Sequence, residues 1–338
     1  MWTTNHPALV AAARVGLRPP GAPAVIGEAD AEFVRRAARS DRLSGMMVAA
    51  LEEGSVEASE AVRAAFVDDW HQQLVACVVV EALVVRCAAA LSAASVEWRL
   101  TKGAAVAHLD YPTTSWRGFG DADVLIRPDQ WDRARRALED AGCRPQFDTV
   151  DDRFVARYGK GVTLDTPEGL ELDLHLRFAV GLFGVRSRME DVFGDDPEYI
   201  ELAGAAIPVL ARPWRLVHAC YHAVLGGFGE LRAFRDVAQL VHAGARLDDA
   251  ARLVGPWKGS AVIAEAAAQT AIRLDLDPSE MALSRPIRPS MVERKVLRVF
   301  LAERPFRAQA LTSLAGLGPR QAADFVAAMV RLRRSRRG

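Results

Sequence analysis

The sequence predicts an α+β protein in which a small sheet domain lies between two helical segments. Long stretches near both ends carry apolar residues at helical spacing, whereas the middle alternates short runs rich in β-branched and apolar residues with turns. We therefore expect three parts: an N-terminal helical module at residues 1–94, a sheet domain at residues 95–211 and a C-terminal helical module at residues 212–338.

The N-terminal module is expected to be helical throughout residues 28–94. Its first turn is acidic, and apolar residues follow at helical spacing. Residues 59–94 contain no Gly or Pro and indicate one or two longer helices. The most apolar part, residues 74–94, is interrupted by Glu81 and Arg86. These charges favour a buried helix over a membrane span.

The later elements follow from turn residues and from the spacing of apolar residues. In the sheet domain we expect, in order, a strand at 96–102, a short helix at 104–109, a strand at 119–126, a helix at 128–141 and antiparallel hairpins at 162–178 and 199–210. Pro213 then starts a series of helices, expected at 213–225, 229–243, 247–254, 260–274 and 290–302, with a last one from 319.

Three aspartates in the sheet domain are the strongest functional signal. Asp121 and Asp123 lie two positions apart in an expected strand, so their carboxylates should point to the same side. Asp173, on an expected neighbouring strand, would complete the cluster. Three carboxylates this close repel one another unless a cation lies between them. Oxygen ligands with room for water and phosphate favour Mg²⁺ or Mn²⁺, so the pattern predicts a metal-phosphate site.

Further motifs accompany these aspartates in a fixed order across residues 95–245. They are Lys102-Gly103, Tyr111-Pro112, Arg117, Asp121-Ala-Asp123, Leu172-Asp-Leu-His175, His218-Ala-Cys-Tyr-His222 and Leu231-Arg-Ala-Phe-Arg-Asp236. This ordered set resembles the uncharacterised nucleotidyltransferase family of the DNA polymerase β superfamily. The resemblance implies a polymerase-β-like mixed sheet and a Mg²⁺-dependent enzyme that moves NMP from an NTP to a hydroxyl of a small-molecule or peptide acceptor.

The resemblance also implies roles for individual residues. Asp121 and Asp123 would bind two divalent ions, and Asp173, beside the second ion, would activate the acceptor hydroxyl. Lys102 would neutralise the triphosphate, and Gly103 would let the backbone approach it closely. Many relatives have Gly-Ser where this chain has Gly103-Ala104. Phosphate would then be held by backbone N–H groups, and catalytic competence is left open.

Each of the remaining candidate site residues has two interpretations. Arg117 would hold phosphate with its planar fork, or it pairs with a surface acid. His175 shares a face with Asp173 and would orient it or touch the acceptor; alternatively it is a hydrogen-bonded structural histidine. Arg232, Arg235 and Asp236 would line the nucleotide cleft; alternatively Asp236 forms an ion pair with Arg232, four residues earlier on one helix.

Two histidines at helical spacing carry a weaker signal. His218 and His222 can bind zinc at this spacing, but the glutamate of the metalloprotease pattern is missing. We therefore expect both in the core or in the wall of the cleft.

The net charge and the cysteines indicate which binding partners and which cellular compartment to expect. The 338 residues include 43 basic and 43 acidic side chains, so no net charge favours long nucleic acid or a membrane surface. Four scattered cysteines without a Cys-x-x-Cys pair favour a reducing compartment, and we expect a cytoplasmic protein. The abundance of Ala, Arg and Val is associated with bacterial genomes rich in G and C.

Two other functions fit the same motifs. One is a non-catalytic regulatory protein that binds nucleotides in a degenerate site. The other is a protein-modifying, antitoxin-like enzyme that transfers AMP to a protein partner. The sequence does not specify the base, the acceptor or the oligomeric state.

Overall fold

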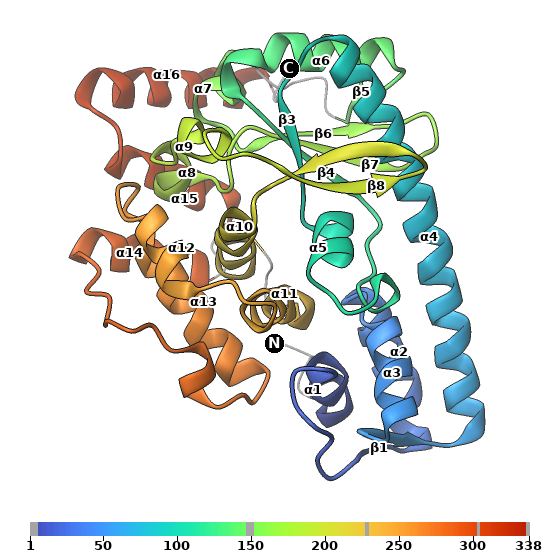
Figure 1. Cartoon of the computed structure of the whole chain (residues 1–338). Coiled ribbons are helices and arrows are strands. Elements are labelled where there is room, and N and C mark those ends of the chain that lie inside the picture. Colours follow the sequence, from blue (N-terminus) through green and yellow to red (C-terminus); the bar gives the residue numbers. More distant parts are fainter. Residues whose placement is uncertain (1–5, 147–151, 227–229, 303–304, 336–338) are drawn as a thin grey trace.

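The computed structural model describes residues 6–146, 152–226, 230–302 and 305–335. Its main sheet consists of β3 (Trp98–Thr101), β4 (Ala122–Ile126), β5 (Arg144–Pro145), β6 (Gly161–Asp165), β7 (Glu171–His175), β8 (Glu198–Leu202) and β9 (Ala205–Val209). The seven strands are mixed in direction and follow the order β5-β6-β7-β4-β3-β9-β8. In Figure 1, helix α6 (Trp131–Asp140) lies above this sheet, and α5 (Gly103–Leu109) and α10 (Arg212–Leu225) lie below it. The predicted α+β fold class is confirmed.

Strand pairing places the functional residues in one row. Both predicted hairpins are present, as β6 with β7 and β8 with β9. Strand β4 runs antiparallel to β3 and parallel to β7. The register pairs Asp123 with Asp173, and Asp173 with Thr163 of β6. Residues directly opposite each other point to the same face of a sheet, so their three side chains converge on one spot.

The N-terminal part is less uniformly helical than predicted. It contains α1 (Pro7–Arg14), α2 (Glu28–Ser40), α3 (Ser44–Glu53) and α4 (Glu60–Ala93). The expectation of helix throughout 28–94 is wrong at β2 (Val56–Ala58), which pairs in parallel with β1 (Ala24–Ile26). Gly54 ends α3 with a φ of 82°, a left-handed conformation that glycine adopts without steric cost and that stops the helix.

Helix α4 runs the length of the molecule from the N-terminal helices to the sheet (Figure 1). One face is buried, with Val80, Val84 and Leu91 in the core, but Val75 and Val78 on the other face are 65% and 63% exposed. The expected burial therefore holds for one side only. By length and composition α4 is apolar enough to cross a membrane, with 39% of its most apolar window buried. Core helices of soluble proteins have the same properties, so this is weak evidence for a span.

Except for a short helix at Phe306–Leu311, which was not predicted, the C-terminal helices lie close to their predicted positions. After α10 come α11 (Leu231–His242), α12 (Leu247–Leu253), α13 (Ser260–Arg273), α14 (Met291–Leu301), α15 (Phe306–Leu311) and α16 (Pro319–Ser335). Residue 229, where the second of these helices was predicted to start, lies outside the described residues.

Two apolar cores hold the elements together. One core joins helices from both ends of the chain, including Met46 of α3, Trp214 of α10 and Val262 of α13. The other lies between α4, α6 and the sheet and includes Val84 and Leu174. Helices of the two proposed helical modules thus share one core, and the domain limits at 94 and 211 stay a prediction.

Candidate active site

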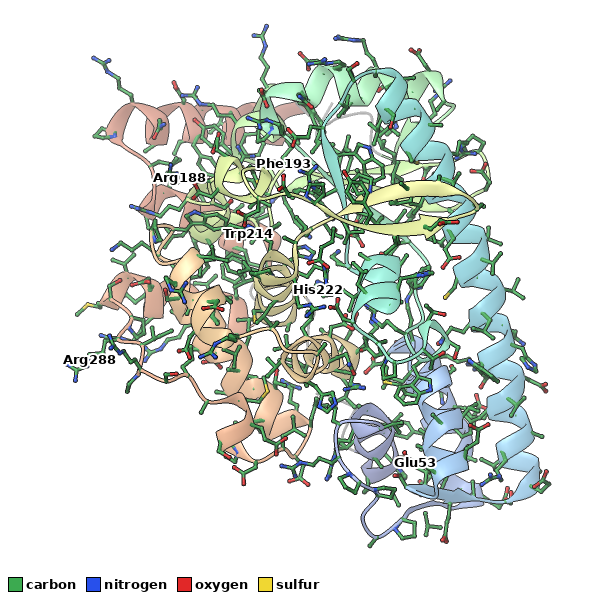
Figure 2. The ribbon with its side chains drawn as sticks, in the orientation of Figure 1. Glu53, Arg188, Phe193, Trp214, His222 and Arg288 are labelled. Atoms are coloured by element: carbon green, nitrogen blue, oxygen red, sulfur yellow. The ribbon has the colours of Figure 1, made fainter. Side chains whose placement is uncertain are left out.

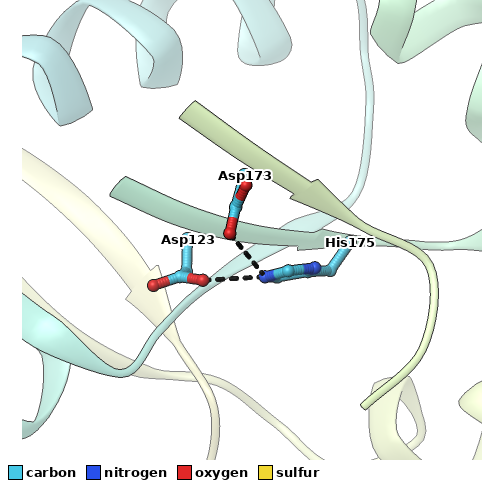
Figure 3. Close-up of side chains that lie close together, drawn as sticks. All are labelled: Asp123, Asp173 and His175. Atoms are coloured by element: carbon cyan, nitrogen blue, oxygen red, sulfur yellow. Dashed lines mark hydrogen bonds and ion pairs between the residues drawn. The ribbon is translucent and has the colours of Figure 1, made fainter. Parts of the chain in front are cut away.

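Two aspartates and a histidine meet on the central strands. One ligand atom from each of Asp123, Asp173 and His175 lies within 4.8 Å of the other two (Figure 3). The His175 Nε2 atom is 2.7 Å from Asp123 Oδ1 and 3.8 Å from Asp173 Oδ2. The cluster exists because β4 and β7 are adjacent and in register. Asp123 and His175 are buried, whereas the side chain of Asp173 is 27% exposed and thus reachable from solvent.

Thr163 orients Asp173 from the far side of the cluster. Its hydroxyl donates a 2.6 Å hydrogen bond to Asp173 Oδ1. This contact follows from the hairpin register, which places Thr163 directly opposite Asp173. Sequence reasoning did not identify Thr163, although counting back from the predicted turn would have paired the two residues.

Lys102 supplies a positive charge inside the cluster. It follows β3, adopts a φ of 50°, and its ammonium forms an ion pair with Asp123. Burial alone would raise the pKa of Asp123, but the Lys102 charge and hydrogen bonds from His175 and Lys102 outweigh it and hold that pKa well below its usual range. Gly103 begins α5 at this point, and a Cβ there would lie 3.1 Å from Phe119 Cβ. Close packing therefore requires a small residue.

Asp121 lies nearby but does not belong to the group of three. It precedes β4, so the prediction that a strand carries both Asp121 and Asp123 is wrong: β4 begins only at Ala122. The Asp121 side chain is 36% exposed, and its Oδ1 is 4.0 Å from Arg42 Nη2. Burial alone would lower the pKa of Lys102, but the negative charge of Asp123 raises it. The charge of Asp121 makes a smaller contribution in the same direction. Arg42, from the turn between α2 and α3, was not identified from the sequence.

Arg117 and Asp236 pair with each other. Arg117 Nε and Nη2 donate to the two carboxylate oxygens of Asp236 at 2.8 and 2.7 Å, and the Tyr111 hydroxyl donates to Oδ1 at 2.9 Å. All three residues are buried. The planar fork of Arg117 is thus directed at a carboxylate of α11, and Arg232 pairs with Glu230 instead of Asp236. The interpretation of Asp236 as the ion-pair partner of Arg232 is wrong, and its place in a nucleotide cleft stays a prediction.

His218 and His222 line a small cavity beside the cluster. Lys102 and Asp236 line the same cavity, as does Val106 of α5. Figure 2 shows His222 on α10, toward α5. Burial, and next the positive charge of Lys102, hold the pKa of both histidines well below the usual range, so both are neutral at physiological pH. Their enclosed position fits the expectation of a place in the core or the cleft wall, and the identity of this cavity as part of a nucleotide cleft stays a prediction.

Lys160 is a second ammonium near the acids and was also missed. Burial, followed by the charge of Lys102, lowers the pKa of Lys160 to about 8, while Asp123, Asp173 and Asp121 act in the opposite direction. The signal that would have found it is its place between Gly159 and Gly161, immediately before the strand that pairs with the Asp173 strand.

Comparisons with known proteins give a family match and similar solved structures. The model of the uncharacterised nucleotidyltransferase family matches residues 27–255, which is more than half of the chain. One similar solved structure is the antibiotic-resistance factor ANT(2'')-Ia, with 14% identity and a TM-score of 0.36 over 55% of this chain and 94% of that one. Another is an antigenic nucleotidyltransferase-like protein from Paracoccidioides brasiliensis, with 13% identity and a TM-score of 0.35 over 60% and 93%. No curated protein matches. The extent of the family match shows that the chain belongs to the uncharacterised nucleotidyltransferase family.

Proposed function

We propose that this protein transfers NMP from an NTP to a hydroxyl of a small-molecule or peptide acceptor, with Mg²⁺ or Mn²⁺ as cofactor. The observation that carries the proposal is the register of β4 and β7, which brings Asp123, Asp173 and His175 within 4.8 Å of one another. In a chain of the nucleotidyltransferase family, two neighbouring carboxylates support a site for the divalent ion that nucleotidyl transfer would use.

The donor set suits a divalent cation. Asp123 and Asp173 offer carboxylate oxygens, and His175 offers a ring nitrogen. Asp121, which is partly exposed, lies two residues before Asp123 in the sequence. We assign the metal to Asp121, Asp123 and Asp173. A divalent ion held there would neutralise phosphate charge and lower the pKa of the acceptor hydroxyl.

The other groups bind, orient and accept protons. Asp173, held by Thr163 and open to solvent, is the residue we assign to accept the hydroxyl proton. His175 lies between the carboxylates of Asp123 and Asp173, and we assign it to hold them in position. Lys102 and the backbone at Gly103 are assigned to the triphosphate.

Three residues further out support the cleft in this proposal. Arg117 and Asp236 fix α11 against the loop before β4 through their ion pair. Arg232 stands one turn earlier on α11, where we assign it to the nucleotide side of the cleft. Its buried guanidinium Nε has no hydrogen-bond partner among the residues that the structure describes, so it has a donor to offer. The neutral overall charge supports an acceptor other than long nucleic acid. The scattered cysteines support a cytoplasmic location.

The test is turnover with each α-labelled NTP, Mg²⁺ and a panel of hydroxyl acceptors. Wild type should release pyrophosphate and add NMP mass to an acceptor, whereas Asp173→Asn should lose at least about a hundredfold in rate. Asp140→Asn, an exposed change at the end of α6, is the matched control and should behave as wild type.

The two alternatives give different results in the same experiment. NTP binding without pyrophosphate release would identify a regulatory nucleotide-binding protein. Added nucleotide mass on a co-expressed protein, found by mass spectrometry, would identify a protein acceptor in place of a small molecule.

A further inference from the structure

The position of Lys160 is fixed by backbone contacts next to the acid cluster. Its carbonyl accepts hydrogen bonds from the N–H groups of Leu176 at 2.6 Å and Arg177 at 3.1 Å, directly after His175. Arg177 Nη1 also donates to the carbonyl of Gly159 at 2.8 Å. The residue after Lys160, Gly161, pairs in register with His175. The backbone that carries this lysine is therefore tied to the strand that carries Asp173 and His175.

The two ammonium groups near the cluster differ in their partners. Lys102 forms an ion pair with Asp123. Within residues 6–146, 152–226, 230–302 and 305–335, the Lys160 ammonium has no hydrogen bond or ion pair, although it is only partly exposed. Burial and the nearby Lys102 charge both disfavour its charged form, as its lowered pKa of about 8 reflects. An enclosed ammonium without a counter-ion is available for an anion that enters the site.

We propose that the Lys160 ammonium binds phosphate oxygens of the NTP triphosphate and is thus a substrate-binding residue of this site. The inference rests on the proposed function and deepens it. Lysine is a compact cation on a flexible stem, which suits contact with any of several phosphate oxygens. Lys102 is paired with Asp123, so Lys160 would add to Lys102 a second ammonium that no carboxylate of the described residues holds.

The test measures the affinity of the full chain for inorganic triphosphate and for each NTP, by isothermal titration calorimetry with Mg²⁺ present. Lys160→Gln should weaken binding of both roughly ten- to a hundredfold, the worth of one charge-assisted hydrogen bond. Lys160→Arg should stay within a few-fold of wild type because it keeps the charge. Lys295→Gln, an exposed change of the same kind on α14, should have no effect.

A second readout separates phosphate binding from a structural role. Mn²⁺ affinity measured without nucleotide should be unchanged or tighter in Lys160→Gln, because a positive charge near the carboxylates has been removed. Triphosphate affinity equal to wild type would overturn the inference, as would weaker Mn²⁺ affinity together with a lower melting temperature. If wild type itself binds neither triphosphate nor any NTP, the proposed function fails, and that result is distinct from a failure confined to Lys160.

Discussion

Replacing Asp236 by asparagine tests whether its pair with Arg117 holds the fold together. The change removes the negative charge that faces two guanidinium nitrogens at 2.7 and 2.8 Å. Both side chains are at least 93% buried, so solvent cannot replace the lost partner. Burial alone would lower the pKa of Arg117, and Asp236 raises it above the usual value. The guanidinium stays charged in the mutant because arginine is not deprotonated in proteins at physiological pH. Breaking such a buried pair on one side costs about 3–5 kcal/mol in the free energy of unfolding.

The assay is urea unfolding followed by circular dichroism, with Asp140→Asn as the exposed control. Asp236→Asn should lower the free energy of unfolding by about 3 kcal/mol or more, near the lower limit because the asparagine oxygen still accepts one hydrogen bond. The control should change it by less than about 0.5 kcal/mol. Replacing both Arg117 and Asp236 by leucine should recover part of the loss, because no unpaired charge is then buried.

An opposite pattern would refute this reasoning. If Asp236→Asn unfolds like wild type but binds triphosphate more than tenfold more weakly, then Arg117 and Asp236 act on the ligand. The pair would then belong to the nucleotide site.

Three further predictions follow from single contacts. Thr163→Val removes the hydrogen bond to Asp173 and should weaken Mn²⁺ binding about tenfold in a calorimetric titration, whereas wild-type affinity would exclude Thr163 as a positioning residue. Triphosphate affinity should fall by up to about tenfold per pH unit above about pH 8 as the Lys160 ammonium loses its proton, and Lys160→Gln should not show this fall between pH 7 and 9. Gly45→Ala should lower the melting temperature because its Cβ would collide with the Ser115 carbonyl, although alanine favours helix. A higher melting temperature would contradict the close packing of α3 on the segment that contains Ser115.

The parts of the site that local sequence patterns specify were predictable. Alternation along a strand places Asp173 and His175 on one face, and the two hairpins follow from turn residues and apolar runs. The position of Asp123 opposite Asp173 depends on strand order, which the family resemblance implied and the register confirms.

The parts that depend on tertiary contacts were not predictable from one sequence. Asp121 precedes β4 because the strand begins at Ala122, three residues later than the apolar pattern suggested. Arg117 finds its partner 119 residues away on α11, and no local spacing indicates that contact. The flanking glycines mark the position of Lys160 in the sequence, but only the folded chain shows that its ammonium lies in a crowded site without a partner among the described residues.

The most direct test of the central claim is divalent-ion binding, measured by the electron paramagnetic resonance of Mn²⁺ with the full chain and an NTP. Wild type and Asp140→Asn should bind Mn²⁺ with equal affinity, and Asp173→Asn should bind it at least about tenfold more weakly, since a ligand oxygen and a charge are lost. Asp173→Asn is the cleaner variant, because changing Asp123 would also leave Lys102 without its counter-ion. Equal Mn²⁺ affinity in all three proteins would contradict the proposed metal site.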